Sequence, residues 1–86
     1  MSSRTIRAEN CQVIDIYGVI KENTDPGGNL NTLELRMVRW GIGAPVYDLR
    51  WWKENSEPGY GLTFRERDLA ELGEIIDQVF EIRKDE

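Results

Sequence analysis

The chain of 86 residues contains no histidine and a single cysteine, Cys11. A lone cysteine cannot form an internal disulfide, and the side chains that usually bind zinc are almost absent. No run approaches the ~20 apolar residues of a membrane-spanning helix, and the N-terminal segment lacks the apolar core of a signal peptide. We therefore expect a cytoplasmic protein without a metal, a cofactor or membrane association. Cys11 is expected to be inert, because no basic residue adjoins it in the sequence.

The chain is also too short to bury a large hydrophobic core. Eighty-six residues make one domain, and a domain of this size buries only about 60–65% of the surface of its unfolded chain. Since disulfides and metals are not expected, association with a second copy is the predicted source of further burial. We expect a flexible N-terminus over residues 1–10, one folded domain over residues 11–83 and a tail over residues 84–86.

Basic residues are too few to balance the acidic ones, and the net charge is −5. The excess is uneven. Residues 65–86 contain eight acidic and four basic residues, while residues 1–64 have a net charge of only −1. An acidic protein is repelled by nucleic acid, yet the nearly neutral first part of this chain permits such a partner without favouring it.

Four segments alternate between apolar and polar residues with the period of two that is typical of strands. Clusters of Gly, Pro, Asn and Asp separate them, and connections of hairpin length predict an antiparallel meander. In the first strand, Ile14, Ile16 and Ile20 are predicted to share one face. In the fourth, Leu62 and Phe64 are predicted to point inward. The predicted strands span residues 11–21, 30–40, 46–52 and 60–64.

The chain is predicted to end in a helix over residues 65–83, which gives an α+β fold of four antiparallel strands and one C-terminal helix. Thr63 and Glu66 fit a capping box at its start, although Thr63 also fits the end of the fourth strand. The apolar residues of the helix span roughly 160° of its circumference, wider than the ~100° stripe that covers one sheet. The excess favours contact with the same helix of a partner subunit. The alternative is a helix sunk deeply into its own sheet. These apolar residues are Leu69, Leu72, Ile75, Ile76, Val79, Phe80 and Ile82.

Alternation in the second and third strands gathers aromatic and cationic side chains on one face. Leu33, Leu35, Met37 and Leu49 occupy the parity that is expected to face the core, and the opposite parity is expected to be exposed. An exposed indole beside guanidinium groups suits unpaired nucleobases, which stack on aromatic faces while their phosphates meet cations. The residues of this outward parity include Arg36, Trp40, Asp48, Arg50 and Trp52.

The same segments carry a resemblance to a known family. The motifs are Glu34-Leu35 followed by Trp40, the run Pro45-Val46-Tyr47-Asp48-Leu49-Arg50-x-Trp52, and Gly59-x-Gly61-Leu62-Thr63 before the helix. Over residues 12–80, the chain resembles the positive cofactor four family of transcriptional coactivators, in particular its bacterial YdbC-like branch. The resemblance implies a homodimer whose curved sheets form grooves for single-stranded DNA or RNA, with little sequence preference and no catalysis. It further implies an accessory role in transcription, replication or repair, near the nucleoid if the source is bacterial.

The resemblance places the family's aromatic positions at Trp40 and Trp52 and its arginine at Arg50. Two alternatives stay open. The tryptophans could fill a dimer interface instead of a groove, and Arg50 could simply pair with Asp48 or with Asp15 or Glu34 on the same face. Weaker candidates for phosphate contact, each equally well explained as a solvated cation, are Arg36, Lys21 and Lys53.

The chain departs from the family pattern at several positions. The turn over residues 41–44 carries no base, where related proteins often have lysines. Tyr60 stands where a lysine is common, and Trp51 where an acidic residue is frequent. These changes predict weaker binding that relies on stacking, or a lost activity. In the second case the same fold would serve as a protein-interaction module.

Two further readings of the sequence are less favoured. Asp15, Glu34 and Asp48 could form a carboxylate cluster for metal-dependent cleavage, since magnesium sites use carboxylates. No Asp-x-Asp pair, histidine or activated nucleophile accompanies them, so we expect neither an enzyme nor a small-molecule substrate. Tyr17 and Tyr60 are expected to be structural, as tyrosines in a half-buried sheet usually are.

Overall fold

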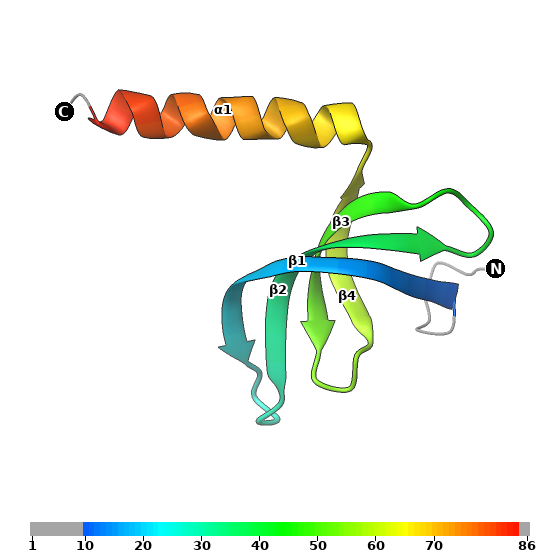
Figure 1. Cartoon of the computed structure of the whole chain (residues 1–86). Coiled ribbons are helices and arrows are strands. Elements are labelled where there is room, and N and C mark those ends of the chain that lie inside the picture. The colour runs from blue at the N-terminus through cyan, green and yellow to red at the C-terminus, as the bar shows by residue number, and fades with distance from the viewer. Residues whose placement is uncertain (1–9, 85–86) are drawn as a thin grey trace.

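The computed structural model describes residues 10–84, in which four antiparallel strands form one curved sheet and a single helix follows (Figure 1). The strand order is β1-β2-β3-β4, so each strand pairs with its neighbour in sequence. The predicted α+β meander is therefore confirmed. Residues 1–9 of the flexible N-terminus predicted over residues 1–10, and the last two residues of the predicted tail, lie outside the described residues. The elements are β1 (Cys11–Thr24), β2 (Leu30–Trp40), β3 (Val46–Lys53), β4 (Pro58–Phe64) and α1 (Glu66–Lys84).

The boundaries follow from local chemistry. In the β1–β2 turn, the Asp25 carboxylate accepts hydrogen bonds from the backbone N–H groups of Gly27 and Asn29, each at 2.9 Å. These bonds favour the charged form, and the bond from Asn29 is the largest cause of a lowered pKa for Asp25. Thr63 lies within β4, so the capping-box reading is wrong. The backbone N–H of Arg65 instead donates to Asp68, in the first turn of α1, at 3.4 Å.

Strand β1 does not keep one continuous alternation. Its pairing with β2 shifts register between Val13 and Asp15, between Ile16 and Gly18, and between Val19 and Lys21. Each bulge inserts an extra residue and moves the following side chains to the other face. The prediction that three isoleucines of this strand share a face is therefore wrong. One of them, Ile16, lies opposite Arg36, while Ile20 lies beside Leu35 on the other face.

The sheet bends toward the face that carries the tryptophans and arginines. Arg50 pairs with Glu34, six positions before Trp40 on β2. A flat strand would separate these positions by about 20 Å. The guanidinium carbon of Arg50 nevertheless lies 5.0 Å from the centroid of the Trp40 ring. We call this side the concave face, and the side that carries Leu35 and Leu49 the convex face.

Burial is the reverse of what alternation predicted. The buried side chains of the described residues all lie on the concave face, where curvature brings them together: Glu34, Val38, Asp48, Arg50 and Trp52. On the convex face Leu33, Leu35, Met37 and Leu49 are only half-buried, and Leu62 is 63% exposed. The expectation of an exposed tryptophan face over a leucine core is wrong, because side chains converge on a concave face and diverge on a convex one.

Helix α1 starts beside the end of β4 and runs past the edge of the sheet (Figure 1). Its first half and the convex face enclose an apolar hollow of about 300 Å³, which Ile20, Leu35, Leu49 and Leu72 help to line. Five apolar residues of α1 remain 43–64% exposed: Ile76, which also lines the hollow, and Ile75, Val79, Phe80 and Ile82. The alternative of a helix sunk into its own sheet is therefore wrong. No helix within residues 10–84 is long and apolar enough to cross a membrane.

Candidate nucleic-acid interface

The concave face holds a row of alternating aromatic, cationic and anionic side chains. The register of β2 and β3 produces it: Thr32 lies opposite Trp52, Glu34 opposite Arg50, and Arg36 opposite Asp48. Residues directly opposite each other in an antiparallel pair share a face, so all six point into the same concavity. Trp40, at the end of β2, joins them because the sheet is bent.

Arg50 is the most constrained member of this row. Its Nε donates to both carboxylate oxygens of Asp48, at 2.9 and 3.2 Å, and its Nη2 donates to one of them at 2.9 Å. Its Nη1 donates to the Gly59 carbonyl oxygen at 2.8 Å. Asp48 is fully buried and Arg50 is 7% exposed. The predicted exposure of Arg50 is therefore wrong, and its alternative pairing with Asp48 is confirmed.

Gly61 is what lets Arg50 lie flat against β4. The two residues are directly opposite in the β3–β4 pair. A Cβ atom at Gly61 would lie 2.5 Å from the Leu49 carbonyl oxygen and 2.5 Å from the Arg50 Cβ, closer than real atoms approach. The glycine of the Gly-x-Gly motif therefore allows the close approach of β3 and β4, and so the contact between Arg50 and the Gly59 carbonyl.

Arg36 covers Trp52. Its guanidinium carbon lies 3.9 Å from the Trp52 ring centroid, in the range of cation–π contacts. Its Nε donates to Glu34 Oε1 at 2.8 Å, and the Thr32 hydroxyl donates to the other carboxylate oxygen. Glu34 thus fixes the orientation of the guanidinium that lies on the indole.

The two tryptophans differ in accessibility. Trp40 is half-buried, whereas Trp52 is 3% exposed, so the predicted exposure of Trp52 is wrong. The Nε1 of Trp52 is buried and has no hydrogen-bond acceptor within the described residues. Buried polar groups of native proteins almost always have a partner, which makes this indole N–H a donor that could serve a ligand or a water molecule.

Lys21 and Lys53 do not join this row. Lys53 lies opposite Asn31 and Lys21 opposite Leu33, both on the convex face. The Lys21 Nζ lies 5.7 Å from the ring centroid of Trp51, which is on the same face. The structure therefore brings together four of the six predicted residues and places the other two on the opposite side of the sheet. The shared parity of Trp51 and Lys53 was a visible signal of this second grouping.

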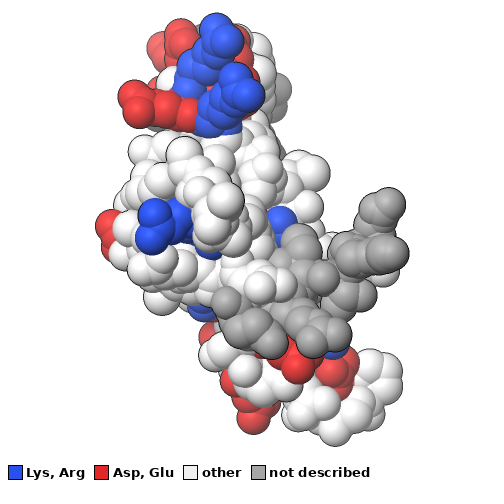
Figure 2. All heavy atoms as spheres, turned by 90° about the vertical axis from the view of Figure 1, so that its right-hand side faces the viewer, with Lys and Arg blue, Asp and Glu red and all other residues white. Residues whose placement is uncertain are grey.

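The charges of the concave face balance locally. Arg36 pairs with Glu34 and Arg50 with Asp48, at 2.8 and 2.9 Å. Asp15 lies opposite Met37 on the convex face, so the less favoured reading, in which Asp15, Glu34 and Asp48 cluster, is wrong. Side chains of both signs are also interspersed on the surface seen in Figure 2, where neutral residues cover most of the described area. Within residues 10–84, no three potential ligands come together as a metal-binding group.

Cys11 lies opposite Trp40 at the margin of the same face. Burial raises the pKa of its thiol, and the nearby Asp48 carboxylate raises that pKa further. A raised pKa keeps the thiol protonated and weakly nucleophilic at neutral pH. The geometry thus gives Cys11 no chemical activation.

The whole arrangement can stack planar ligands and donate hydrogen bonds to them without supplying a net positive charge. Comparison of the chain with protein-family models, curated proteins and solved structures finds no match.

Proposed function

We propose that this protein is a homodimeric, cytoplasmic binder of single-stranded DNA or RNA with little sequence preference, acting as an accessory in transcription, replication or repair. The observation that carries the proposal is the concave row, which contains two guanidinium–indole pairs. The guanidinium carbon of Arg36 lies 3.9 Å from the Trp52 ring centroid, and that of Arg50 lies 5.0 Å from the Trp40 ring centroid. Bases of a single strand stack on such rings without regard to sequence. The resemblance to the positive cofactor four family supports the same assignment.

Trp40 is the residue that a base reaches first. It is half-buried, and Arg50 is held beside it by Asp48 and the Gly59 carbonyl. An anchored guanidinium loses little entropy when one of its remaining N–H groups meets a phosphate. A base reaches Trp52 only when Arg36 moves off the ring, and the indole Nε1 can then donate to the ligand.

The helix supports the dimeric part of the proposal. Its exposed apolar residues continue from the hollow above the convex face toward the end of α1. Contiguous exposed apolar surface usually marks a protein interface. A second copy of α1 would cover this surface and add the burial that a domain of this size lacks.

A second function is favoured by the charge balance of the concave face. Because both arginines are paired with carboxylates, the row has no excess positive charge to attract a phosphate backbone. The same fold could then serve as a protein-interaction module through the acidic helix and its apolar residues. The measured affinity for single-stranded nucleic acid decides between the two functions, because only the first requires it.

The test is a titration with labelled oligothymidylate and with a hairpin duplex of equal length, at two salt concentrations. We expect preference for the single strand, because a duplex hides its base faces, and a shallow salt dependence. Trp40→Ala should weaken binding by roughly 1–3 kcal/mol without unfolding the protein. Ile42→Ala, at a fully exposed turn residue, is the control. Equal affinity for both nucleic acids, or an unchanged Trp40→Ala, would reject the proposal.

Trp52→Ala is a less clean test than its position in the motif suggests. Truncating a buried tryptophan typically costs about 3–5 kcal/mol of folding free energy, so lost binding would be confounded with unfolding. Lys53→Ala should cost less affinity than either tryptophan variant, since Lys53 is exposed and lies on the other face.

A further inference from the structure

A second aromatic and cationic site lies on the convex face, at the end of the sheet far from α1. It is a hollow of about 250 Å³ between the ends of all four strands. We call it the convex pocket. Tyr60 in it is 92% exposed, so the prediction of a structural tyrosine is wrong, and Trp51 is half-buried. The residues that line the pocket are Asn23, Asn31, Trp51, Lys53, Gly59 and Tyr60.

Two lysine ammonium groups lie in or near this pocket. Lys53 lines it, and the Lys21 Nζ lies 5.7 Å from the centroid of the Trp51 ring. Among residues 10–82, whose side chains the structure describes, the ion pairs are those of the concave face, so neither lysine is paired with a carboxylate of this part of the chain. Aromatic rings beside unpaired cations are the combination that holds a base by its face and a phosphate by its charge.

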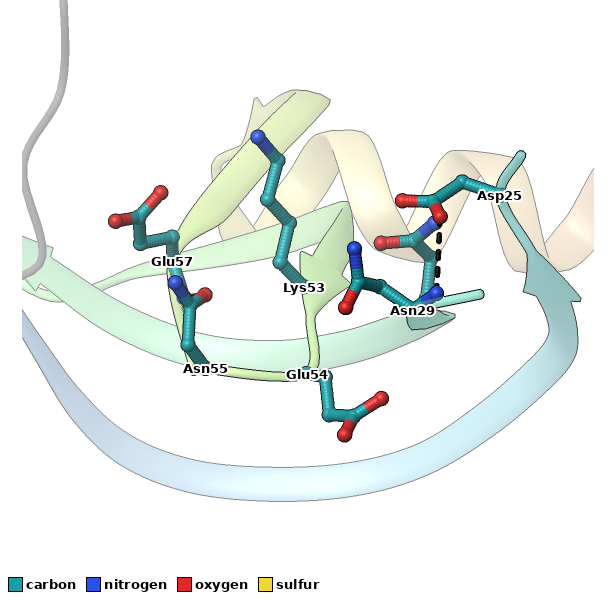
Figure 3. A pocket seen from close by; sticks show the side chains of 7 residues that line it. Asp25, Asn29, Lys53, Glu54, Asn55 and Glu57 are labelled. Carbon is teal, nitrogen blue, oxygen red and sulfur yellow. Dashed lines mark hydrogen bonds between the residues drawn. The ribbon is translucent and has the colours of Figure 1, made fainter. Parts of the chain in front are cut away.

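The nearest carboxylates lie in an adjoining hollow, which shares Asn31 and Lys53 with the convex pocket. Asp25 is engaged by backbone N–H groups of its own turn, and Glu54 accepts the Leu30 N–H at 2.8 Å. Figure 3 shows Lys53 extending away from Glu54. The acidic side chains of the adjoining hollow disfavour phosphate on that side, so a phosphate in the convex pocket belongs near Lys21.

We propose that the convex pocket binds one nucleotide of the same single strand, with the base on Trp51 and Tyr60 and the phosphate near Lys21 and Lys53. The pocket is smaller than the roughly 300–1,000 Å³ of drug-sized ligands, which suits a single base better than a larger molecule. Asn23 and Asn31 supply amide donors and acceptors for the base edge. The two aromatic residues that depart from the family pattern meet at this pocket.

The chain path explains how one strand reaches both faces. Trp51 and Trp52 are consecutive, so they point to opposite sides of β3 at the same end of the sheet. Gly59 links the two sites, because its carbonyl binds Arg50 on the concave face while the residue lines the convex pocket. A single nucleic-acid strand that is bound at Trp52 therefore passes around this end of the sheet to reach Trp51. This inference rests on the proposed function for its ligand class.

The test is an NMR titration of the full chain with oligothymidylate of about twelve residues, observing the three indole N–H resonances. Each resonance is assigned from a Trp→Phe variant. A shift of the Trp51 resonance supports the convex pocket, and an unmoved one overturns it. The Trp40 and Trp52 resonances report separately on the concave face, so a shift of Trp51 alone would reject the concave face as the binding site and leave the convex pocket standing. If none of the three resonances shifts, the proposed function and the convex pocket are both rejected.

Affinity supplies the second measurement. Tyr60→Ala should weaken binding of the long oligonucleotide about fivefold or more, because one stacked base is lost. The fully exposed Ile42→Ala variant should bind like the wild type. Since Tyr60 is almost entirely exposed, its removal should leave the melting temperature unchanged. Wild-type affinity in Tyr60→Ala would overturn the convex pocket even if the concave face binds.

Discussion

Glu34→Gln tests whether local charge pairing limits the affinity of the concave face. Glu34 accepts hydrogen bonds from Arg36 and from the Thr32 hydroxyl, and it is 7% exposed. Glutamine has nearly the same shape, so the packing survives while the negative charge disappears. Arg36 then carries an uncompensated positive charge beside Trp52.

Two effects of opposite sign follow. Loss of a charge-assisted hydrogen bond should lower the free energy of unfolding by about 1.5–3 kcal/mol. One additional cation that meets a phosphate should steepen the dependence of log K on log salt by about 0.7 for a single strand. Between 50 and 200 mM salt, that slope widens the affinity ratio by about 2.6-fold. Binding should therefore be tighter than in the wild type at low salt, although the protein is less stable.

The assay is fluorescence anisotropy of labelled oligothymidylate at both salt concentrations, with urea unfolding measured on the same samples. Glu71→Gln removes the same charge from an exposed position on α1 and is the matched control. If both variants change affinity equally, only net charge matters. If Glu34→Gln binds no better than the wild type at low salt while remaining folded, Arg36 does not meet phosphate, and the reasoning is refuted.

Three other expectations concern stability and assembly. Gly61→Ala should lower the free energy of unfolding by about 1–3 kcal/mol in urea, because its Cβ would overlap the Leu49 carbonyl; an unchanged midpoint would contradict the close approach. Light scattering should show a wild-type dimer at micromolar concentration, and a wild-type mass near 10.0 kDa would exclude it. Ile76→Asp should be a monomer, because an unpaired charge buried in the dimer interface costs several kcal/mol. The native turn stabilises the Asp25 carboxylate and lowers its pKa below the value of 3.8 that applies to the unfolded chain. The extra stability of the wild type over Asp25→Asn should therefore be complete above pH 3.8 and be lost as the pH falls through the lower pKa of the folded state. A melting-temperature difference constant from neutral to strongly acidic pH would contradict this.

The order and type of all five elements could be predicted from the sequence because each signal is local. Alternation marks β2 and β3, and Asp25, Pro26 and the following glycines mark the turn before β2. The grouping of Trp40, Arg36, Arg50 and Trp52 on one face also follows from alternation, since register and parity agree in these strands. The resemblance points to three of these side chains, Trp40, Arg50 and Trp52, and alternation alone adds Arg36.

Which face is buried could not be predicted in the same way. Alternation shows which residues share a face, and the more apolar of the two faces is then assigned to the core. In this chain, curvature outweighs hydrophobicity, because it brings Arg50 against Trp40 and Arg36 against Trp52. Arg50 is buried as a result, and the Arg36 side chain is only 13% exposed. The three register shifts in β1 have no visible signal in the sequence either, and the shift between Val13 and Asp15 places Asp15 opposite Met37 on the convex face.

The carboxylates paired with Arg36 and Arg50 fix the orientation of these side chains, which a count of basic residues does not show. Asp48 and the Gly59 carbonyl together hold Arg50 in a single orientation, and Glu34 does the same for Arg36. An arginine held in this way contributes a flat polar surface and directed N–H groups more than a free charge. Binding built on such groups depends on the shape and exposure of bases rather than on counterion release. A net charge of −5 is therefore compatible with a single-strand binder, provided that affinity persists at salt concentrations that would release a basic protein.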